Sequence, residues 1–450
     1  MKNDLFEKAP IHTAYLKLAI PVVLSMVVTL IYNMVDTYFI ALTHDNNLIA
    51  GVSICTPLFT LFLALGDMLS LGGSSVISRF LGAGRGDDAK RISVFCFYGS
   101  VVLGLIVTVI MLAAKTPILY FLGADADTFA YASQYYTYIV AGCTFIIFTL
   151  APSNLLRAVG HPNAAMVTSV LGAVVNMILD PILIFGLGMG AAGAAIATII
   201  GYICSTIYAV LYINKKCDGL SLSLKGFFIS AQELGMLFAV GLPASVTNFT
   251  QTIGITLTNR HLTVYGSDAI AVMGIVLKIV NIVMLVIVGL AFGGQPLTGY
   301  VYGSGNSERL KKVLSFAYKI VCGTGLVLAG IMALVAKPVL HIFLQEQSLI
   351  DIGALMLRLQ MPCMVLMGFG LVTICTFQSM GKGLPALILS LCRQGIVYWA
   401  VITVFSKVFG YQGVISSQLG ADVVSVVIAL ILFMIVIKPE LSRSADTASV

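Results

Sequence analysis

The stretch Leu81-Gly82-Ala83-Gly84 recurs in the second half of the chain as Tyr302-Gly303-Ser304-Gly305, and the same shift along the sequence places Gly72-Gly73 on Gly293-Gly294. Most residues between these positions are apolar. Further matches at this shift, or one residue from it, are Arg91 with Lys312, Gly160 with Gly381, Ala165 with Ala386, Pro21 with Pro243, Gly190 with Gly410 and Gly193 with Gly413. A long apolar duplication predicts a pseudosymmetric membrane protein built from two repeats, an architecture common among secondary transporters.

The composition supports a membrane protein. Charged residues make up 10% of the chain and apolar residues 59%, whereas a soluble domain carries about 25% charged residues. A spanning helix needs about 20 apolar residues. We therefore expect an all-α polytopic fold with twelve spans, six per lobe, over residues 14–41, 49–77, 93–114, 129–151, 164–187, 191–213, 234–258, 269–299, 314–336, 354–378, 385–406 and 411–437. The length of these runs and the lack of period-2 alternation exclude a β-barrel.

Lysine and arginine are distributed unevenly between the two sets of loops. Nineteen fall in one set, with Arg157 and Arg393 counted among them, and five fall in the other: Lys115, Arg260, Lys337, Arg358 and Lys407. Because cytoplasmic loops carry the excess of positive charge, both termini are predicted to be cytoplasmic. We expect the protein to lie in the inner cell membrane. The net charge of +6 is scattered over short loops, so we expect no nucleic-acid partner.

The longest cytoplasmic connection divides the chain. It begins with Lys215-Lys216-Cys217-Asp218-Gly219 and could hold a short amphipathic helix at the membrane interface. We expect an N-lobe over residues 1–213, a linker over 214–233, and a C-lobe over 234–450 that ends in a short cytoplasmic tail.

Enzyme motifs are absent from the sequence. Gly188-x-Gly190-x-x-Gly193 matches the dinucleotide fingerprint, but it joins two apolar spans rather than following a strand. The nine cysteines form no Cys-x-x-Cys pair and lie mostly in apolar spans, where they act as small buried side chains. We expect no enzyme activity and no cofactor.

The fifth span carries the most specific polar pattern. Asn176 and Asp180 are four residues apart and share one helix face. Pro181 has no N–H, so the carbonyl of Met177 loses its helical partner. A carboxylate, an amide oxygen and a free carbonyl suit Na⁺ or a proton relay. The structural alternative is a proline kink with a capping aspartate near the outer end of the span.

Other charged residues inside spans are candidates for function, because a central carboxylate costs about 2.5–3.5 kcal/mol on insertion scales. Asp36 lies late in the first span, one turn after Asn33, and the alternative is that it reaches the membrane interface. Asp67 precedes Gly72-Gly73-Ser74-Ser75, which allow close helix approach and could bend the helix. In the second repeat, Lys278 and Asp422 could pair with each other or line a substrate cavity.

With these motifs, the chain resembles the multidrug and toxic compound extrusion (MATE) family over nearly its whole length. The resemblance is carried by Asn33-Met34-Val35-Asp36-Thr37, Ile77-Ser78-Arg79-Phe80-Leu81-Gly82-Ala83-Gly84, Arg157-Ala158-Val159-Gly160, Asn176-Met177-Ile178-Leu179-Asp180-Pro181-Ile182-Leu183-Ile184-Phe185-Gly186 and Gly193-Ala194-Ala195-Ile196-Ala197-Thr198. It is most similar to the branch that includes the staphylococcal-type multidrug exporters.

The resemblance implies a V-shaped pair of six-helix lobes that exports lipophilic cations in exchange for Na⁺ or H⁺. The cation site of the family's N-lobe falls on Asp36, Asn176, Asp180 and Thr198. Where some members have a C-lobe glutamate, this chain has Gln251, which puts coupling through the C-lobe in doubt. Aromatic and methionine side chains such as Tyr32 could give the cavity an adaptable apolar wall. The implied partners are the lipid bilayer and small-molecule drugs, and we expect a monomer.

Three alternatives remain. A flippase of a lipid-linked precursor shares the wider fold, but it would be expected to show a cationic cavity, and only Lys278 and Arg260 are available in the second lobe. A membrane-embedded prenyl transferase or protease would need an aspartate-rich metal motif or a nucleophile. A purely structural membrane protein gives no reason to keep Asp36 and Asp180 in apolar spans.

Overall fold

The computed structural model describes residues 4–224 and 227–442, and these residues contain helices but no β-strand. Among them, nine helices are long and apolar enough to cross a membrane. The number is ten if α7 (Phe129–Ala141) and α8 (Cys143–Ala158), which meet at a bend of 46°, are counted together as one span. The last of these, Gly383–Leu441, covers the two predicted spans 385–406 and 411–437, which meet at a kink where Gly410 has a φ of +56°. The predicted seventh span lies on α11 (Ala231–Leu262). The all-α polytopic fold is confirmed.

The helices divide into two units. Of the described residues, unit 1 contains 24–245 and unit 2 contains 4–23 and 246–442. The helix α2 (Ile11–Ala41) therefore begins in unit 2 and continues in unit 1, while α11 begins in unit 1 and continues in unit 2. Each unit is described separately below.

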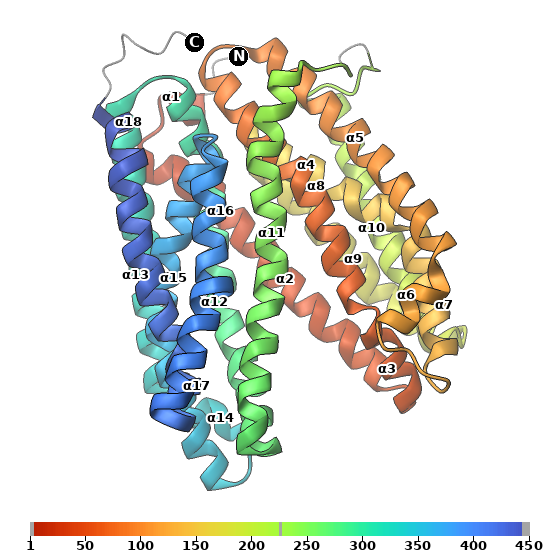
Figure 1. Ribbon diagram of the computed structural model, residues 1–450. Coiled ribbons are helices and arrows are strands. Elements are labelled where there is room, and N and C mark those ends of the chain that lie inside the picture. The colour runs from red at the N-terminus through yellow and green to blue at the C-terminus, as the bar shows by residue number, and fades with distance from the viewer. Residues whose placement is uncertain (1–3, 225–226, 443–450) are drawn as a thin grey trace. The chain divides into compact units, whose positions relative to one another are not determined.

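Unit 1 is built around α8 (Cys143–Ala158), which is buried along almost its whole length and contacts α4, α5, α9 and α10. Figure 1 shows these elements in red to yellow-green. The remaining elements of the unit are α3 (Asn46–Ile54), α4 (Thr56–Gly82), α5 (Gly86–Ala113), α6 (Lys115–Phe121), α7 (Phe129–Ala141), α9 (Pro162–Pro181), the π-helix η1 (Ile182–Gly186) and α10 (Gly190–Lys216).

Unit 2 has an equivalent central helix, α15 (Gln347–Ser379), which contacts α12, α13 and α17. The shift that aligns the two repeats places α8 on the second half of α15, as expected for a duplication. The other elements of the unit are α1 (Asp4–Glu7), the 3-10 turn η3 (Thr263–Tyr265), α12 (Ser267–Gly303), α13 (Ser307–Leu334), α14 (Ala336–His341), α16 (Gly383–Leu391), the π-helix η4 (Cys392–Ile396), α17 (Val397–Leu432), the π-helix η5 (Phe433–Ile437) and α18 (Lys438–Ser442).

The start of α2 packs tightly in unit 2. The Tyr15 hydroxyl donates a hydrogen bond of 2.9 Å to the Leu290 carbonyl. A Cβ atom on Gly293 would lie 2.3 Å from the Cα of Ala19, so the backbones of α2 and α12 touch here. Glycine permits this approach, because lipid offers no hydrophobic drive and helices associate by close packing.

The glycine pair of α4 has the same role in unit 1. A Cβ atom on Gly72 would lie 2.4 Å from the Leu237 carbonyl oxygen, and one on Gly73 would lie 2.4 Å from the Cys96 sulfur. The prediction of close helix approach is therefore confirmed. The helix α4 continues without a break through both glycines, and the bend stays a prediction.

The linker between the repeats is hydrogen-bonded to α5. The Ser221 N–H donates to Ser93 Oγ at 3.0 Å, and the Tyr98 hydroxyl donates to the Leu222 carbonyl at 2.8 Å. At its end, Glu233 is 4% exposed, pairs with Arg91 at 2.5 Å and accepts hydrogen bonds from Ser230, as in a capping box. The described linker residues, 217–224 and 227–230, hold no α-helix, so no amphipathic helix is found there.

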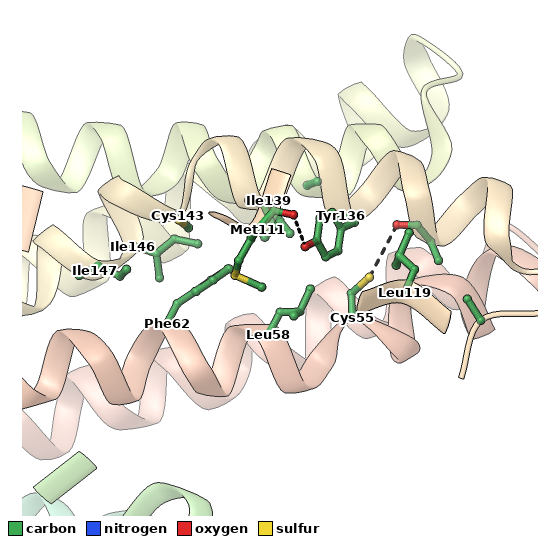
Figure 2. Close-up of a cluster of buried hydrophobic side chains, with 14 residues drawn as sticks. Cys55, Leu58, Phe62, Met111, Leu119, Tyr136, Ile139, Cys143, Ile146 and Ile147 are labelled. Carbon is green, nitrogen blue, oxygen red and sulfur yellow. Dashed lines mark hydrogen bonds between the residues drawn. The ribbon is translucent and has the colours of Figure 1, made fainter. Parts of the chain in front are cut away.

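A compact apolar cluster holds α7 against its neighbours in unit 1 (Figure 2). It contains the buried side chains of Phe62, Met111 and Tyr136. The Tyr136 hydroxyl donates to the Met111 carbonyl at 2.7 Å, which satisfies a polar group that lipid could not. Tyr135, the preceding residue on α7, packs at the edge of the cluster. The cluster therefore fixes the position of Tyr135, which matters for the site described next.

A glycine pair brings α9 and α10 together. A Cβ atom on Gly201 would lie 2.6 Å from the Gly172 carbonyl oxygen, so even one methyl group would push the two backbones apart. We expect Gly201→Ala to destabilise the protein by about 1–3 kcal/mol through overpacking. The control is Gly99→Ala on α5, where the nearest atom would be 3.8 Å away. Thermal unfolding in detergent measures both, and equal melting temperatures would contradict the close contact.

Candidate functional site

The polar pattern of the fifth predicted span lies at the end of α9. Asn176 and Asp180 are 2% and 0% exposed, one turn apart on the same face. Pro181 follows, and the chain then changes from α-helix to the π-helix η1. This change is consistent with the hydrogen bond that a proline removes, and short π-helical segments are frequent at functional sites. The predicted distortion is therefore present beside the predicted ligands.

The helix α10 contributes Thr198, which is also buried. Asn176 Nδ2 donates to Thr198 Oγ1 at 3.1 Å, and Thr198 Oγ1 donates to the Ala194 carbonyl at 3.0 Å. The amide nitrogen of Asn176 is thereby occupied, and its Oδ1 atom points elsewhere. The hydrogen bond fixes which end of the amide is free.

The Oδ1 atom of Asn176 is one of three buried acceptor atoms near the end of α9. Asn176 Oδ1, Asp180 Oδ1 and Asp180 Oδ2 are all buried and accept no hydrogen bond from any described residue. Buried oxygen atoms without donors are costly unless a proton or a cation reaches them. All three atoms are hard oxygen ligands of the kind that Na⁺ prefers, so the residues present fit a cation.

Asp36 completes this group of acceptors from α2. Its carboxylate is half-buried and lies close enough to that of Asp180 for the two to interact directly. Tyr32, one turn earlier, lies near Asp36 and beside the Thr198 hydroxyl. The structure thus brings together Asp36, Asn176, Asp180 and Thr198, the set that the resemblance implied, and it adds Tyr32.

Two tyrosines of the site are not predicted by the sequence. Tyr135 on α7 faces both Asp36 and Asp180, and Tyr202 on α10 lies near Tyr32. Tyr202 follows Thr198 by four residues, so their shared helix face could have indicated it. Nothing in the sequence around Tyr135 indicates its place.

The other predicted N-lobe residues lie differently. Asn33 is exposed and makes no side-chain hydrogen bond to a described residue. Asp67 belongs to a separate polar group, in which Ser70 donates to it at 3.5 Å and Asn154 donates to Ser70 at 2.7 Å. Arg157 adds a positive charge to that group. Asp67 therefore has local partners, whereas the carboxylate of Asp180 accepts no hydrogen bond from a described residue.

The C-lobe candidates also need correction. Asp422 on α17 pairs with Arg393 at 3.1 Å, so of the two alternatives for Lys278 and Asp422, the ion pair between them is not formed. The charge count assigns Arg393 to a cytoplasmic loop, but this residue lies in η4 within a spanning segment. Lys278 is exposed on α12. The side chain of Gln251 lies outside the described residues.

The sequence model of the MatE family matches this chain twice, over residues 21–182 and 243–403. The chain belongs to the MatE family. The two matched segments begin at Pro21 and Pro243, which the internal repeat aligns with each other, so the duplication seen in the sequence is that of the family. The multidrug and toxic compound extrusion resemblance is confirmed.

Relatives cover almost the whole of this MatE chain. The multidrug export protein MepA of Staphylococcus aureus (strain MRSA252) is 30% identical over 430 residues, which are 95% of this chain and 94% of that protein. A solved outward-facing multidrug resistance MATE family transporter of the MOP superfamily has a TM-score of 0.92 and 27% identity, and the match covers 98% of this chain and 99% of that one.

A second solved structure is a MOP superfamily transporter from Pyrococcus furiosus, whose binding pocket is described as having reverse polarity. It has a TM-score of 0.90 and 28% identity, and the match covers 98% of both chains. These proteins are transporters and export proteins, not enzymes, and this MatE protein is a membrane-embedded transporter.

Proposed function

We propose that this transporter exports lipophilic or cationic small molecules from the cell, in exchange for Na⁺ or H⁺ bound between Asp36 and Asp180. The observation that carries the proposal is the buried carboxylate of Asp180, which accepts no hydrogen bond from a described residue and lies beside a second carboxylate. The multidrug export activity named for the relatives supports the direction and the substrate class.

The electrostatics of the site support a cation from solution. Asp36 and Asp180 form no ion pair with a described lysine or arginine, whereas Asp422 in unit 2 has Arg393 as its counter-ion. Two ionised carboxylates in a low-dielectric site repel each other and favour binding of a proton or a metal cation. Thr198 and Tyr32 add neutral oxygen atoms to the site.

Coupling requires only that the cation and the exported molecule differ in their preference for two conformers, or compete for one cavity. The aromatic side chains of Tyr32 and Tyr135 lie beside the carboxylates, and Tyr202 lies near both tyrosines. A lipophilic cation can contact these rings through dispersion and cation–π attraction, and its charge would compete with the coupling ion for the same carboxylates.

Ethidium efflux from inverted membrane vesicles tests the proposal. We expect accumulation of ethidium, driven by an imposed Na⁺ gradient or an imposed H⁺ gradient, and the two gradients are applied separately to identify the coupling ion. No response to either gradient, with the protein present at normal level, would contradict antiport.

The direction of export depends on the orientation in the membrane, for which we propose cytoplasmic termini. Asn46 precedes α4 and Gly86 follows it. Ser307 is the first residue of α13, and Ser348 lies beyond the other end of that helix. In a variant without native cysteines, single cysteines at Asn46 and Ser348 should react with an impermeant thiol reagent added to whole cells. Cysteines at Gly86 and Ser307 should react only after the membrane is opened. The reverse pattern would invert the proposed topology.

A further inference from the structure

Unit 2 contains a buried charged cluster that the proposed coupling site does not use. Arg393 in η4 and Asp422 on α17 are joined by a contact of 3.1 Å between Nε and Oδ1, and their side chains are 13% and 1% exposed. Gln418, one turn before Asp422, donates to the same Oδ1 atom at 3.1 Å. All three residues lie in unit 2, so the distances within the cluster do not depend on unit 1.

The cluster leaves hydrogen-bonding capacity unused on both partners. Asp422 Oδ2 is buried and accepts no hydrogen bond from a described residue. Arg393 donates only through Nε, and its two terminal nitrogens donate to no described residue. Arg–carboxylate pairs frequently close as a bidentate fork, in which both carboxylate oxygens are satisfied. This pair makes a single contact, and among the described residues Asp422 Oδ2 has no donor.

Neutral polar side chains lie beside the pair. Tyr398 lies near Asp422, and its hydroxyl is hydrogen-bonded to the Thr258 hydroxyl at 2.5 Å. The cluster therefore combines one positive and one negative charge in a site that is neutral overall. The site in unit 1 differs, because it has two carboxylates and no described counter-ion.

The two sites occupy related places in the duplicated fold. The alignment that places Gly190 on Gly410 also places Thr198 on Gln418. Each residue contributes one hydrogen bond to its site, from α10 in one unit and α17 in the other. The second repeat thus keeps a polar site at the equivalent helix but gives it a different charge.

The charge of this site selects among ligand classes. A simple cation is attracted to Asp422 but repelled by Arg393, and a simple anion is attracted to Arg393 but repelled by Asp422. Neither ion therefore gains much electrostatic binding energy. A molecule that carries an ammonium and a carboxylate on the same carbon atom can satisfy both residues at once. Since Arg393 is more exposed than Asp422, such a ligand would meet the guanidinium first.

We propose that Arg393 and Asp422 form a dipolar subsite for amphiphilic compounds with an amino-acid head group. Arg393 binds the carboxylate through its free terminal nitrogens, and Asp422 Oδ2 accepts from the ammonium. The inference rests on the proposed export function and names a substrate class for it. It assigns no role in ion coupling to the second unit.

The test uses two fluorescent probes that differ by one carboxylate. Nε-dansyl-lysine carries adjacent ammonium and carboxylate groups, and monodansylcadaverine is the same molecule without the carboxylate. Binding to the purified full-length transporter in lipid nanodiscs is measured by fluorescence titration without any ion gradient. We expect the wild-type protein to bind dansyl-lysine at least about tenfold more tightly than dansylcadaverine, as a charge-assisted bidentate contact implies.

Two variants separate a binding role from a structural one. Arg393→Lys keeps the charge and loses the planar fork, so the preference for dansyl-lysine should fall to about threefold or less. Arg393→Gln with Asp422→Asn keeps the polar contacts and removes both charges, so the preference for dansyl-lysine should disappear.

Each outcome of the experiment bears on the subsite. Equal binding of the two probes by wild type would overturn it, as would a full preference in either variant. If wild type binds dansylcadaverine but shows no preference, the subsite fails and the proposed export function stands. If wild type binds neither probe and moves no ethidium in vesicles, both proposals fail together.

Discussion

Asp180→Asn and Asp36→Asn are each expected to abolish gradient-driven efflux while the protein still folds and inserts. Asparagine keeps the size of the side chain and some of its hydrogen bonding, but it removes the charge. The coupling ion then loses its main differential interaction with the two conformers and can no longer drive exchange. The initial rate of ethidium accumulation in vesicles should fall by at least about tenfold, which corresponds to about 1.4 kcal/mol of lost interaction.

The matched control is Asp87→Asn, the same chemical change at an exposed position in the first turn of α5. It should leave efflux unchanged. Thr198→Ala removes one neutral oxygen and should weaken coupling without eliminating it. Efflux at the wild-type rate in both carboxamide variants, at matched protein levels, would remove Asp36 and Asp180 from the coupling mechanism.

The site in unit 1 could be predicted from the sequence because its main signals are local. Asn176, Asp180 and Pro181 lie within one helical turn, and a proline after a carboxylate in an apolar span has few structural explanations. The partner Asp36 is a charge in another apolar span, one turn after Asn33, and this pattern made it a candidate. The pattern could not show that Asp36 lies against Asp180, which depends on how α2 packs in unit 1.

Residues that reach a site from a further helix are not predictable in this way. Tyr135 is one of eighteen tyrosines, and only the apolar cluster that holds α7 reveals its position beside the carboxylates. Arg393 is misplaced by the charge count because a positive charge in a hydrophobic protein usually marks a loop. Its counter-ion Asp422 is 29 residues away in the chain, so the pair that makes burial tolerable is visible only in three dimensions.

The approximate limits of the spans followed from hydrophobicity, but the unit to which each helix end belongs did not. The start of α2 packs in unit 2 and the start of α11 packs in unit 1. Contacts such as the one between Gly293 and Ala19 determine this exchange, and they join residues from opposite halves of the chain. Gly72 and Gly73 likewise make contacts whose partner helices the sequence could not identify. Glycine in a membrane helix serves close packing as readily as bending, and the carbonyl of Leu237 lies where a side chain would be.

The second large effect is expected at Arg393. Replacement of Arg393 by methionine leaves the Asp422 carboxylate buried, 1% exposed, with Gln418 as its only described hydrogen-bond donor. Removing one partner of a buried ion pair costs about 3–5 kcal/mol, because the remaining charge is uncompensated. We expect Arg393→Met to lower the melting temperature in detergent sharply and to reduce the amount of protein in the membrane.

The double variant Arg393→Met with Asp422→Leu distinguishes this cause from simple loss of packing. Replacing both partners of a buried pair by apolar residues is often neutral or stabilising, so the double variant should recover most of the lost stability. It should also bind dansyl-lysine no better than dansylcadaverine, since both charges are gone. Recovery of the fold without recovery of the preference would mean that the pair is retained for recognition rather than for stability. If Arg393→Met melts at the wild-type temperature, Asp422 is not an uncompensated buried charge, and the electrostatic account of the cluster is wrong.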